Sequence, residues 1–219
     1  MLLMLANLSP RAIVHAMFVA PQSFRFAKFA PAKGEALKHE LLETIHGDHR
    51  WRKDSDNDPS PGRTRRLYRP DTHNVFDRLL FGGSHPFKSI MADCARAAET
   101  VMTQRVGAQN WVANRMLVNH FLPGAKLAEH QDDEHFRDGV LVFGLGEAEF
   151  TYLDDKLNSV VLDTQKDNKD NPAFSIVWVP PDVRHAVKTG DDVRISVSAM
   201  CDDRIEAGRS LARVTLLGR

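Results

Sequence analysis

The sequence has few cysteines, no excess of charge and no long apolar run, and each absence excludes a class of protein. Its 219 residues include two cysteines, Cys94 and Cys201, which lack the close spacing of a zinc knuckle or a disulfide framework. Basic and acidic residues both number 29, so no global charge attracts nucleic acid or a membrane. No stretch approaches the roughly 20 apolar residues of a membrane-spanning helix. We therefore expect reduced thiols, no membrane contact, and a polyanion site only as a local patch.

Acidic residues are also missing from the first 34 positions, which contain four basic ones. This bias is shared by organelle transit peptides. The opening Met-Leu-Leu-Met-Leu, however, lacks the basic start of a secretory signal. We expect a cytoplasmic or nuclear protein, with a cleaved organelle transit peptide as the alternative.

The rest of the composition suits a globular chain of one domain, long enough to bury a substantial core. Apolar residues recur at helical spacing in 34–45 and 87–105, and short strand patterns separated by turn residues follow residue 111. We predict an α+β fold, a double-stranded β-helix (jelly-roll) core buttressed by N-terminal helices. Residues 1–110 are expected to form a helical elaboration with a substrate lid and residues 111–219 the core, in one monomeric structural domain.

Residues 50–69 are basic and rich in turn formers, which predicts a loop. In one interpretation this loop is a mobile lid, whose arginines meet phosphates and whose aromatic residues stack on a base. In the other it is a solvated loop whose aspartates partly neutralise its arginines. The sequence leaves both open. The candidate substrate contacts in this segment are Trp51, Arg65, Arg66 and Tyr68.

Two metal-ligand side chains stand two residues apart at His130 and Asp132. In an extended chain residues i and i+2 point to the same side, so this imidazole and carboxylate can face one ion. His185 is the candidate third ligand, because it follows an apolar run at 174–179 that could be a strand near the first. Two imidazoles and one carboxylate on one face of an octahedral ion leave three positions open, as in non-heme Fe(II) oxygenases.

Other residues could also bind the metal ion or anchor a co-substrate. A second His-x-Asp at His46 and Asp48 lies at a predicted helix end, where a C-cap glycine and a favourable helix dipole explain it structurally. Asp133 is three residues from His130, an offset that sends it to the opposite face of a strand. Arg194 follows His185 by nine residues, and its guanidinium could hold one carboxylate of a dicarboxylic co-substrate bidentately.

A longer stretch carries a family resemblance. Residues 119–132, Asn-His-Phe-Leu-Pro-Gly-Ala-Lys-Leu-Ala-Glu-His-Gln-Asp, resemble the Asn-x-Tyr-x-Pro-Gly and His-x-Asp signature of the AlkB family of nucleic-acid dealkylases. Residues 143–150 are similar to the family's Ser-Leu-Gly strand, and residues 194–196 to the start of its Arg-x-(Asn/Ser)-x-Thr-x-Arg ending. Two positions depart from the pattern: Phe121 replaces the family's tyrosine, and Met200 replaces its second arginine.

The resemblance implies an enzyme that uses Fe(II), 2-oxoglutarate as co-substrate, and dioxygen. It implies that iron is held by His130, Asp132 and His185. The residues that it places around 2-oxoglutarate are Asn119, Arg194, Phe121 and Ser196.

The implied function is oxidation of alkylated nucleobases in DNA or RNA, by demethylation or by stable hydroxylation. The short interval from His185 to Arg194 also resembles the prolyl-hydroxylase branch, so hydroxylation of a protein side chain or a small molecule is the alternative. A third hypothesis is a cupin-like metal-binding module or a nucleic-acid binder without turnover. Glu134 and His135 follow the His-x-Asp strand and could either reach substrate or be solvated.

Overall fold

The computed structural model describes residues 18–25, 34–47, 52–53, 62–68, 88–165, 168–169 and 173–205. The helices in these ranges are α3 (Gly34–Gly47) and α5 (Lys88–Val101), and α5 continues into the π-helical turn η2 (Met102–Val106). The strands are β1 (Gln22–Phe24), β2 (Arg52–Lys53), β3 (Arg63–Tyr68), β4 (Arg115–Phe121), β5 (Lys126–His130), β6 (Phe136–Leu145), β7 (Ala148–Leu153), β8 (Ser159–Leu162), β9 (Phe174–Val179), β10 (His185–Thr189) and β11 (Arg194–Asp202). No helix in the described ranges is long and apolar enough to cross a membrane.

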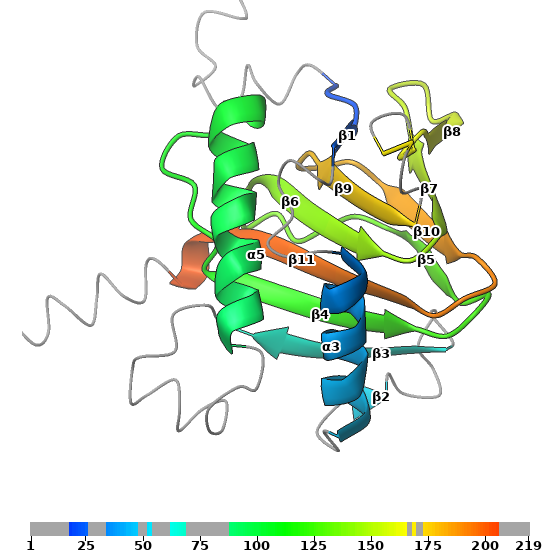
Figure 1. Ribbon diagram of the computed structural model, residues 1–219. Helices are drawn as coiled ribbons and strands as arrows, with labels where there is room; N and C mark the ends of the chain where they lie inside the picture. The colour runs from blue at the N-terminus through cyan, green and yellow to red at the C-terminus, as the bar shows by residue number, and fades with distance from the viewer. Residues whose placement is uncertain are drawn as a thin grey trace, which may run out of the picture.

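The strands form two antiparallel sheets that face each other (Figure 1). The larger sheet has the strand order β1-β9-β6-β11-β4-β3-β2, and the smaller has the order β5-β10-β7-β8. Strands that are distant in sequence, such as β4, β11 and β6, lie next to one another, as the crossovers of a jelly roll require. The predicted jelly-roll core is confirmed.

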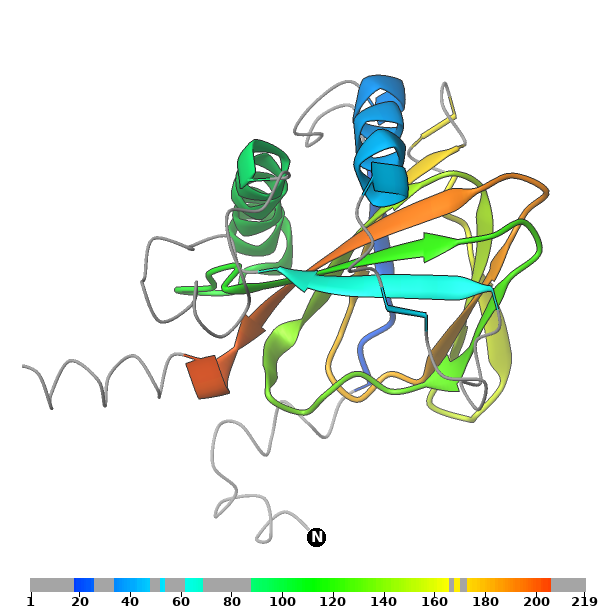
Figure 2. The same ribbon diagram turned by 90° about the horizontal axis from the view of Figure 1, so that it is seen from below.

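Both helices lie on one side of the larger sheet, opposite the smaller sheet (Figure 2). Strand β11 explains this arrangement, because its apolar side chains alternate with side chains that point to the opposite face of the sheet. Its residues Ile195, Val197 and Ala199 join the core cluster that contains Leu41 of α3 and Met91 of α5. The intervening polar residues of β11 face the other way, into the space between the sheets. The sheet therefore has one apolar face for the helices and one face for a site.

The prediction of a loop over residues 50–69 is wrong for residues 63–68. This segment is strand β3, which pairs with β4 from Arg63 opposite Phe121 to Tyr68 opposite Met116. The cause is tertiary, because the backbone groups of β4 on this side need partners and β3 supplies them. Strands β1, β2 and β3 thus come from the segment expected to be a helical elaboration, and they belong to the larger sheet.

Candidate active site

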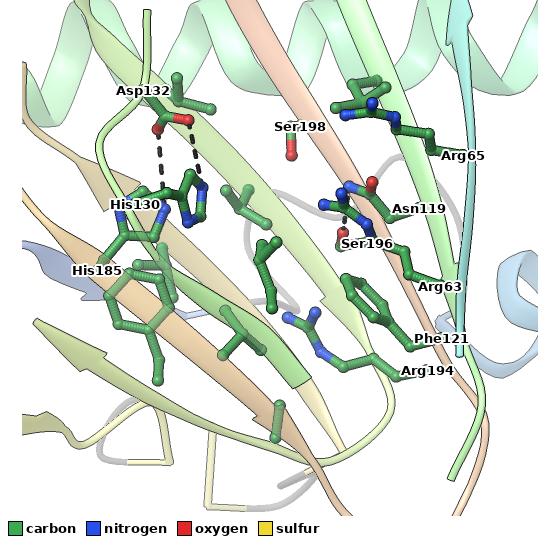
Figure 3. A pocket seen from close by; sticks show the side chains of 18 of the residues that line it. Arg63, Arg65, Asn119, Phe121, His130, Asp132, His185, Arg194, Ser196 and Ser198 are labelled. Carbon is green, nitrogen blue, oxygen red and sulfur yellow. Dashed lines mark hydrogen bonds and ion pairs between the residues drawn. The ribbon is translucent and has the colours of Figure 1, made fainter. Parts of the chain in front are cut away.

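A cavity of about 970 Å³ opens between the two sheets. Its floor is the inner face of the larger sheet, where strand register arranges the side chains in rows. One row consists of Arg63, Phe121 and Arg194. The next row consists of Arg65, Asn119, Ser196, Gly144 and Ser175. Figure 3 shows residues of these rows on one side of the cavity, namely Arg63, Arg65, Asn119, Phe121, Arg194 and Ser196, with His130, Asp132 and His185 on the other.

The three predicted metal ligands come together at this second side. Ligand atoms of His130, Asp132 and His185 all lie within 4.8 Å of one another. The Nε2 atoms of His130 and His185 are each 3.8 Å from a different carboxylate oxygen of Asp132. The two histidines face each other because β5 and β10 pair in register at these residues, with ring centroids 4.3 Å apart. Pairing of the two strands thus assembles ligands that are 55 residues apart in sequence.

The orientation of both imidazoles is set by backbone carbonyls. The Nδ1 of His130 is 2.9 Å from the carbonyl oxygen of Ala128, and the Nδ1 of His185 is 3.1 Å from that of Val183. An Nδ1–H that donates to a carbonyl leaves the Nε2 lone pair for a metal. Burial lowers the pKa of His185 despite the opposing charge of Asp132, so its ring is neutral at pH 7, as a ligand must be.

The alternative ligands lie elsewhere. The carboxylate of Asp133 is turned to Arg204, whose Nη2 is 2.7 Å from Asp133 Oδ2. His46 is exposed on α3 and meets His120 edge-on, with ring centroids 6.3 Å apart. Its His-x-Asp partner Asp48 lies outside the described residues.

Arg194 is a buried cation on the cavity floor, only 4% exposed. Its guanidinium carbon lies 5.7 Å from the centroid of the Phe121 ring, and its Nε has no hydrogen-bond partner among the described residues. Burial lowers the pKa of Arg194 to about 10, which still leaves it charged at neutral pH. Gly144 makes room for it, because a Cβ at that position would lie 2.7 Å from Arg194 Nη2.

Asn119 is another buried polar residue of the cavity with an atom that has no partner among the described residues. Its Nδ2 donates to Ser196 Oγ at 3.1 Å, whereas its Oδ1 has no partner among the described residues. Burying such atoms without partners costs about 1–3 kcal/mol each. The unused atoms of Asn119 and Arg194 therefore indicate a polar ligand in the cavity.

Comparison with known proteins gives a match at the level of fold. No protein-family model matches the chain, and no curated protein sequence matches it. A prolyl hydroxylase from Trichoplax adhaerens, solved with a peptide fragment of the hypoxia inducible factor oxygen degradation domain, is similar with a TM-score of 0.55. The identity is 12%, over 87% of this chain and 86% of that one. The structure of OsALKBH1 is similar with a TM-score of 0.50 and 19% identity, over 84% of this chain and all of that one.

This chain has the fold of the 2-oxoglutarate- and Fe(II)-dependent oxygenases.

The residues present fit the metal and the co-substrate of this oxygenase fold. His130, Asp132 and His185 offer two nitrogens and one carboxylate, the donor set that suits Fe(II) with open positions. In the same cavity, the buried guanidinium of Arg194 suits a carboxylate.

The residues predicted to contact substrate lie at different places relative to the cavity. Arg65 lines the cavity from β3, whereas Glu134 is exposed and is not among the described side chains that line it. Arg66 and Tyr68 lie on β3, but their side chains are outside the described residues, and Trp51 is outside them altogether. Arg63 also lines the cavity, and the sequence did not lead us to predict it. The period-two alternation of Arg63, Arg65 and Leu67 was the signal that could have found it.

Proposed function

We propose that this protein is an Fe(II)/2-oxoglutarate-dependent dioxygenase. The observation that carries the proposal is the occurrence, in one cavity, of the His130-Asp132-His185 group and the buried cation of Arg194. A metal site alone would fit a cupin-like binding module equally well. A charged guanidinium buried on the floor of the same cavity has no use in such a module, but it suits a dicarboxylic co-substrate.

Each residue then has a defined task. The Nε2 atoms of His130 and His185 and the carboxylate of Asp132 would hold iron, and Arg194 would bind the distal carboxylate of 2-oxoglutarate. Asn119 would add a polar contact through its amide. When bound, iron and 2-oxoglutarate supply the oxidation, in which one dioxygen atom enters succinate, formed with carbon dioxide, and the other enters a substrate C–H bond.

The test is succinate production from 2-oxoglutarate under air with Fe(II). The wild-type protein should produce succinate, and His130→Ala should not, since it removes one metal ligand. Arg96→Ala on α5 is the matched control, because Arg96 forms an exposed ion pair with Asp93 away from the cavity. Absence of iron-dependent succinate formation with every substrate tried would leave a metal-binding module or a nucleic-acid binder without turnover.

We propose further that the substrate is an alkylated nucleobase in DNA or RNA. Two features support this choice: the AlkB-like signature at residues 119–132, and the two arginines that β3 places on the cavity wall. Arg63 and Arg65 could contact phosphates, which typically supply much of the affinity for nucleic acid. Val140, Val142 and Met200 line another part of the cavity and would offer an apolar surface to an alkyl group.

Methylated DNA and RNA oligonucleotides distinguish the outcomes for this substrate. N-methyl bases should release formaldehyde, a 5-methylpyrimidine should gain a hydroxymethyl group, and both products should be absent with His130→Ala. Binding should weaken steeply with salt, because phosphate contacts release counterions. Inactivity on all methylated nucleic acids would refute this substrate and leave the dioxygenase assignment standing.

The second candidate is hydroxylation of a protein side chain or a small molecule. Three observations favour it: Phe121 lacks the tyrosine hydroxyl of the AlkB signature, Met200 replaces its second arginine, and His185 precedes Arg194 by only nine residues. Met200 lies on the cavity wall and is 3% exposed, so the missing arginine changes the cavity itself. Succinate formation stimulated by peptide or metabolite pools, and not by oligonucleotides, would select this candidate.

A further inference from the structure

The metal ligand Asp132 lies outside regular secondary structure. It belongs to the turn 131–135, which connects β5, ending at His130, to β6, beginning at Phe136. Among the described residues, its carboxylate oxygens lie 3.8 Å from the Nε2 atoms of the two histidines, which is beyond hydrogen-bond distance. The backbone of the turn must therefore be held in place by other groups if the carboxylate is to meet a metal.

The end of β11 holds that turn through several bonds. Arg204 Nη2 is 2.7 Å from Asp133 Oδ2, on the residue next to Asp132. The backbone N–H of Asp203 donates to the carbonyl of His135 at 3.1 Å. Within the turn, the N–H of Phe136 donates to the carbonyl of Asp133 at 2.9 Å. The turn is thus bonded both within itself and to residues 203 and 204.

Arg204 can act as a rigid link because its other end is anchored. Its Nε and Nη2 each lie 2.9 Å from a carboxylate oxygen of Asp202, a bidentate contact. Asp202 is 1% exposed, and Arg115 Nη1 is 2.6 Å from its Oδ2. Asn114 also exchanges two hydrogen bonds with the backbone of Asp202. The guanidinium of Arg204 is therefore fixed by a buried carboxylate, although its side chain is 47% exposed.

We propose that Arg204 is a positioning residue for the metal site, holding the turn that carries Asp132 through its contact with Asp133. This inference rests on the proposed function only in taking His130, Asp132 and His185 as the metal ligands. An ordinary exposed ion pair contributes little to stability and would leave a distant site unaffected. A positioning role requires instead that loss of Arg204 change metal affinity, as loss of a residue supporting a metal ligand typically does.

The first experiment measures metal affinity without turnover. Co(II) is titrated into the metal-free protein under nitrogen and followed by its visible absorption. We expect Arg204→Ala to weaken Co(II) binding by about tenfold, the lower end of the range for residues that support ligands. Arg204→Lys should restore part of the affinity, since an ammonium can reach Asp133 but cannot form the bidentate contact with Asp202. Arg96→Ala should bind Co(II) like the wild type.

A second variant separates positioning from folding. Asp133→Asn leaves the contact between Arg204 and Asp202 in place and removes only the charged partner in the turn. Glu134→Gln is its control, because it removes the same charge from the same turn at a residue not bonded to Arg204 in the structure. Asp133→Asn should weaken Co(II) binding clearly more than Glu134→Gln does. Equal effects would mean that charge alone acts, and would overturn the positioning role.

Hydrogen exchange in the metal-free protein gives an independent readout. The amides of Phe136 and Asp203, which donate across this turn, should exchange faster in Arg204→Ala than in the wild type. Unchanged Co(II) affinity in both Arg204→Ala and Asp133→Asn overturns the inference while leaving the metal site in place. Failure of the wild-type protein to bind Co(II) overturns the proposed function together with it.

Discussion

Replacing Arg194 by methionine should separate stability from co-substrate binding. Burial lowers the pKa of Arg194 well below its ordinary value, to about 10, which corresponds to about 3 kcal/mol of unfavourable free energy for the charged form. Its Nε also lacks a partner among the described residues. Methionine keeps the length and apolar contacts of the side chain and removes the charge. Apolar replacements of buried ion pairs are often neutral or stabilising by about 1–4 kcal/mol, and we expect the same direction for this buried cation.

Some of that gain is offset by lost contacts. The cation–π contact with Phe121, at 5.7 Å, is worth about 0.5–2 kcal/mol. We therefore expect the free energy of unfolding of the ligand-free Arg194→Met protein to exceed that of the wild type by about 1–2 kcal/mol. For a chain of this size that corresponds to a melting temperature higher by about 2–8 °C. Thermal unfolding followed by circular dichroism in the absence of ligand measures this difference in melting temperature.

The affinity for 2-oxoglutarate should move in the opposite direction. Loss of one partner from a buried charge pair costs about 2–5 kcal/mol, so binding should weaken by at least about 30-fold. Calorimetric titration with Mn(II) in place of iron measures this without turnover. Arg65→Met is the matched control, since it removes the same charge from an exposed position in the same cavity and should change neither quantity much. A ligand-free Arg194→Met protein that melts far below the wild type, or that binds 2-oxoglutarate normally, would refute the reasoning.

Three further predictions concern other positions. Gly144→Ala would place a methyl group 2.7 Å from Arg194 Nη2 and 2.5 Å from Ser175 Oγ. Titration with 2-oxoglutarate should therefore show an affinity weaker by about tenfold, or about 1.4 kcal/mol. The fold should be retained, because both neighbouring atoms are at the ends of side chains. Burial raises the pKa of Asp202, but hydrogen bonds from Arg204 and Arg115 outweigh it and lower the pKa from 3.8 to about 2. Since the pKa of Asp202 is lower in the folded state, this carboxylate should contribute about 2 kcal/mol of stability above pH 4, and the contribution should be lost between about pH 4 and pH 2. Urea unfolding should show this loss in the wild type but not in Asp202→Asn. Burial raises the pKa of the Cys94 thiol to about 12, so iodoacetamide at pH 8 should label it, by mass spectrometry, only after unfolding.

The grouping of His130 with Asp132 was predictable because its pattern is local. His130 and Asp132 are two residues apart, and a strand geometry alone places them on one side. The alternation of β4 explains why Asn119 and Phe121 line the cavity, whereas His120 between them meets His46 of α3. His185 required more, because its position depends on the register between β5 and β10. That register puts it directly opposite His130, and sequence spacing alone does not specify it.

The network around Arg204 could not have been read from the sequence. Asp133 and Arg204 are 71 residues apart, and neither belongs to a periodic pattern. Asp202 is the last residue of β11, and an acidic residue at the end of a strand is typical of an exposed turn. It is buried instead, because Arg115 from β4 and Arg204 both reach it. Long-range pairing of charges decides its burial, and no local rule anticipates that pairing.

The error at β3 follows from the same cause and bears on the substrate. A segment with arginines at 63, 65 and 66 has the composition of a solvated loop, and local propensity gives no reason to place it in a sheet. Pairing with β4 overrides that composition and turns Arg63 and Arg65 into the cavity, on the row positions next to Phe121 and Asn119. A lid could adapt to many substrates, whereas side chains on a paired strand hold fixed positions beside Phe121 and Asn119, which are proposed to lie near the co-substrate. Substrate choice in this protein should therefore depend on Arg63 and Arg65 as parts of the sheet, and their conservative replacement by lysine should change substrate affinity more than 2-oxoglutarate affinity.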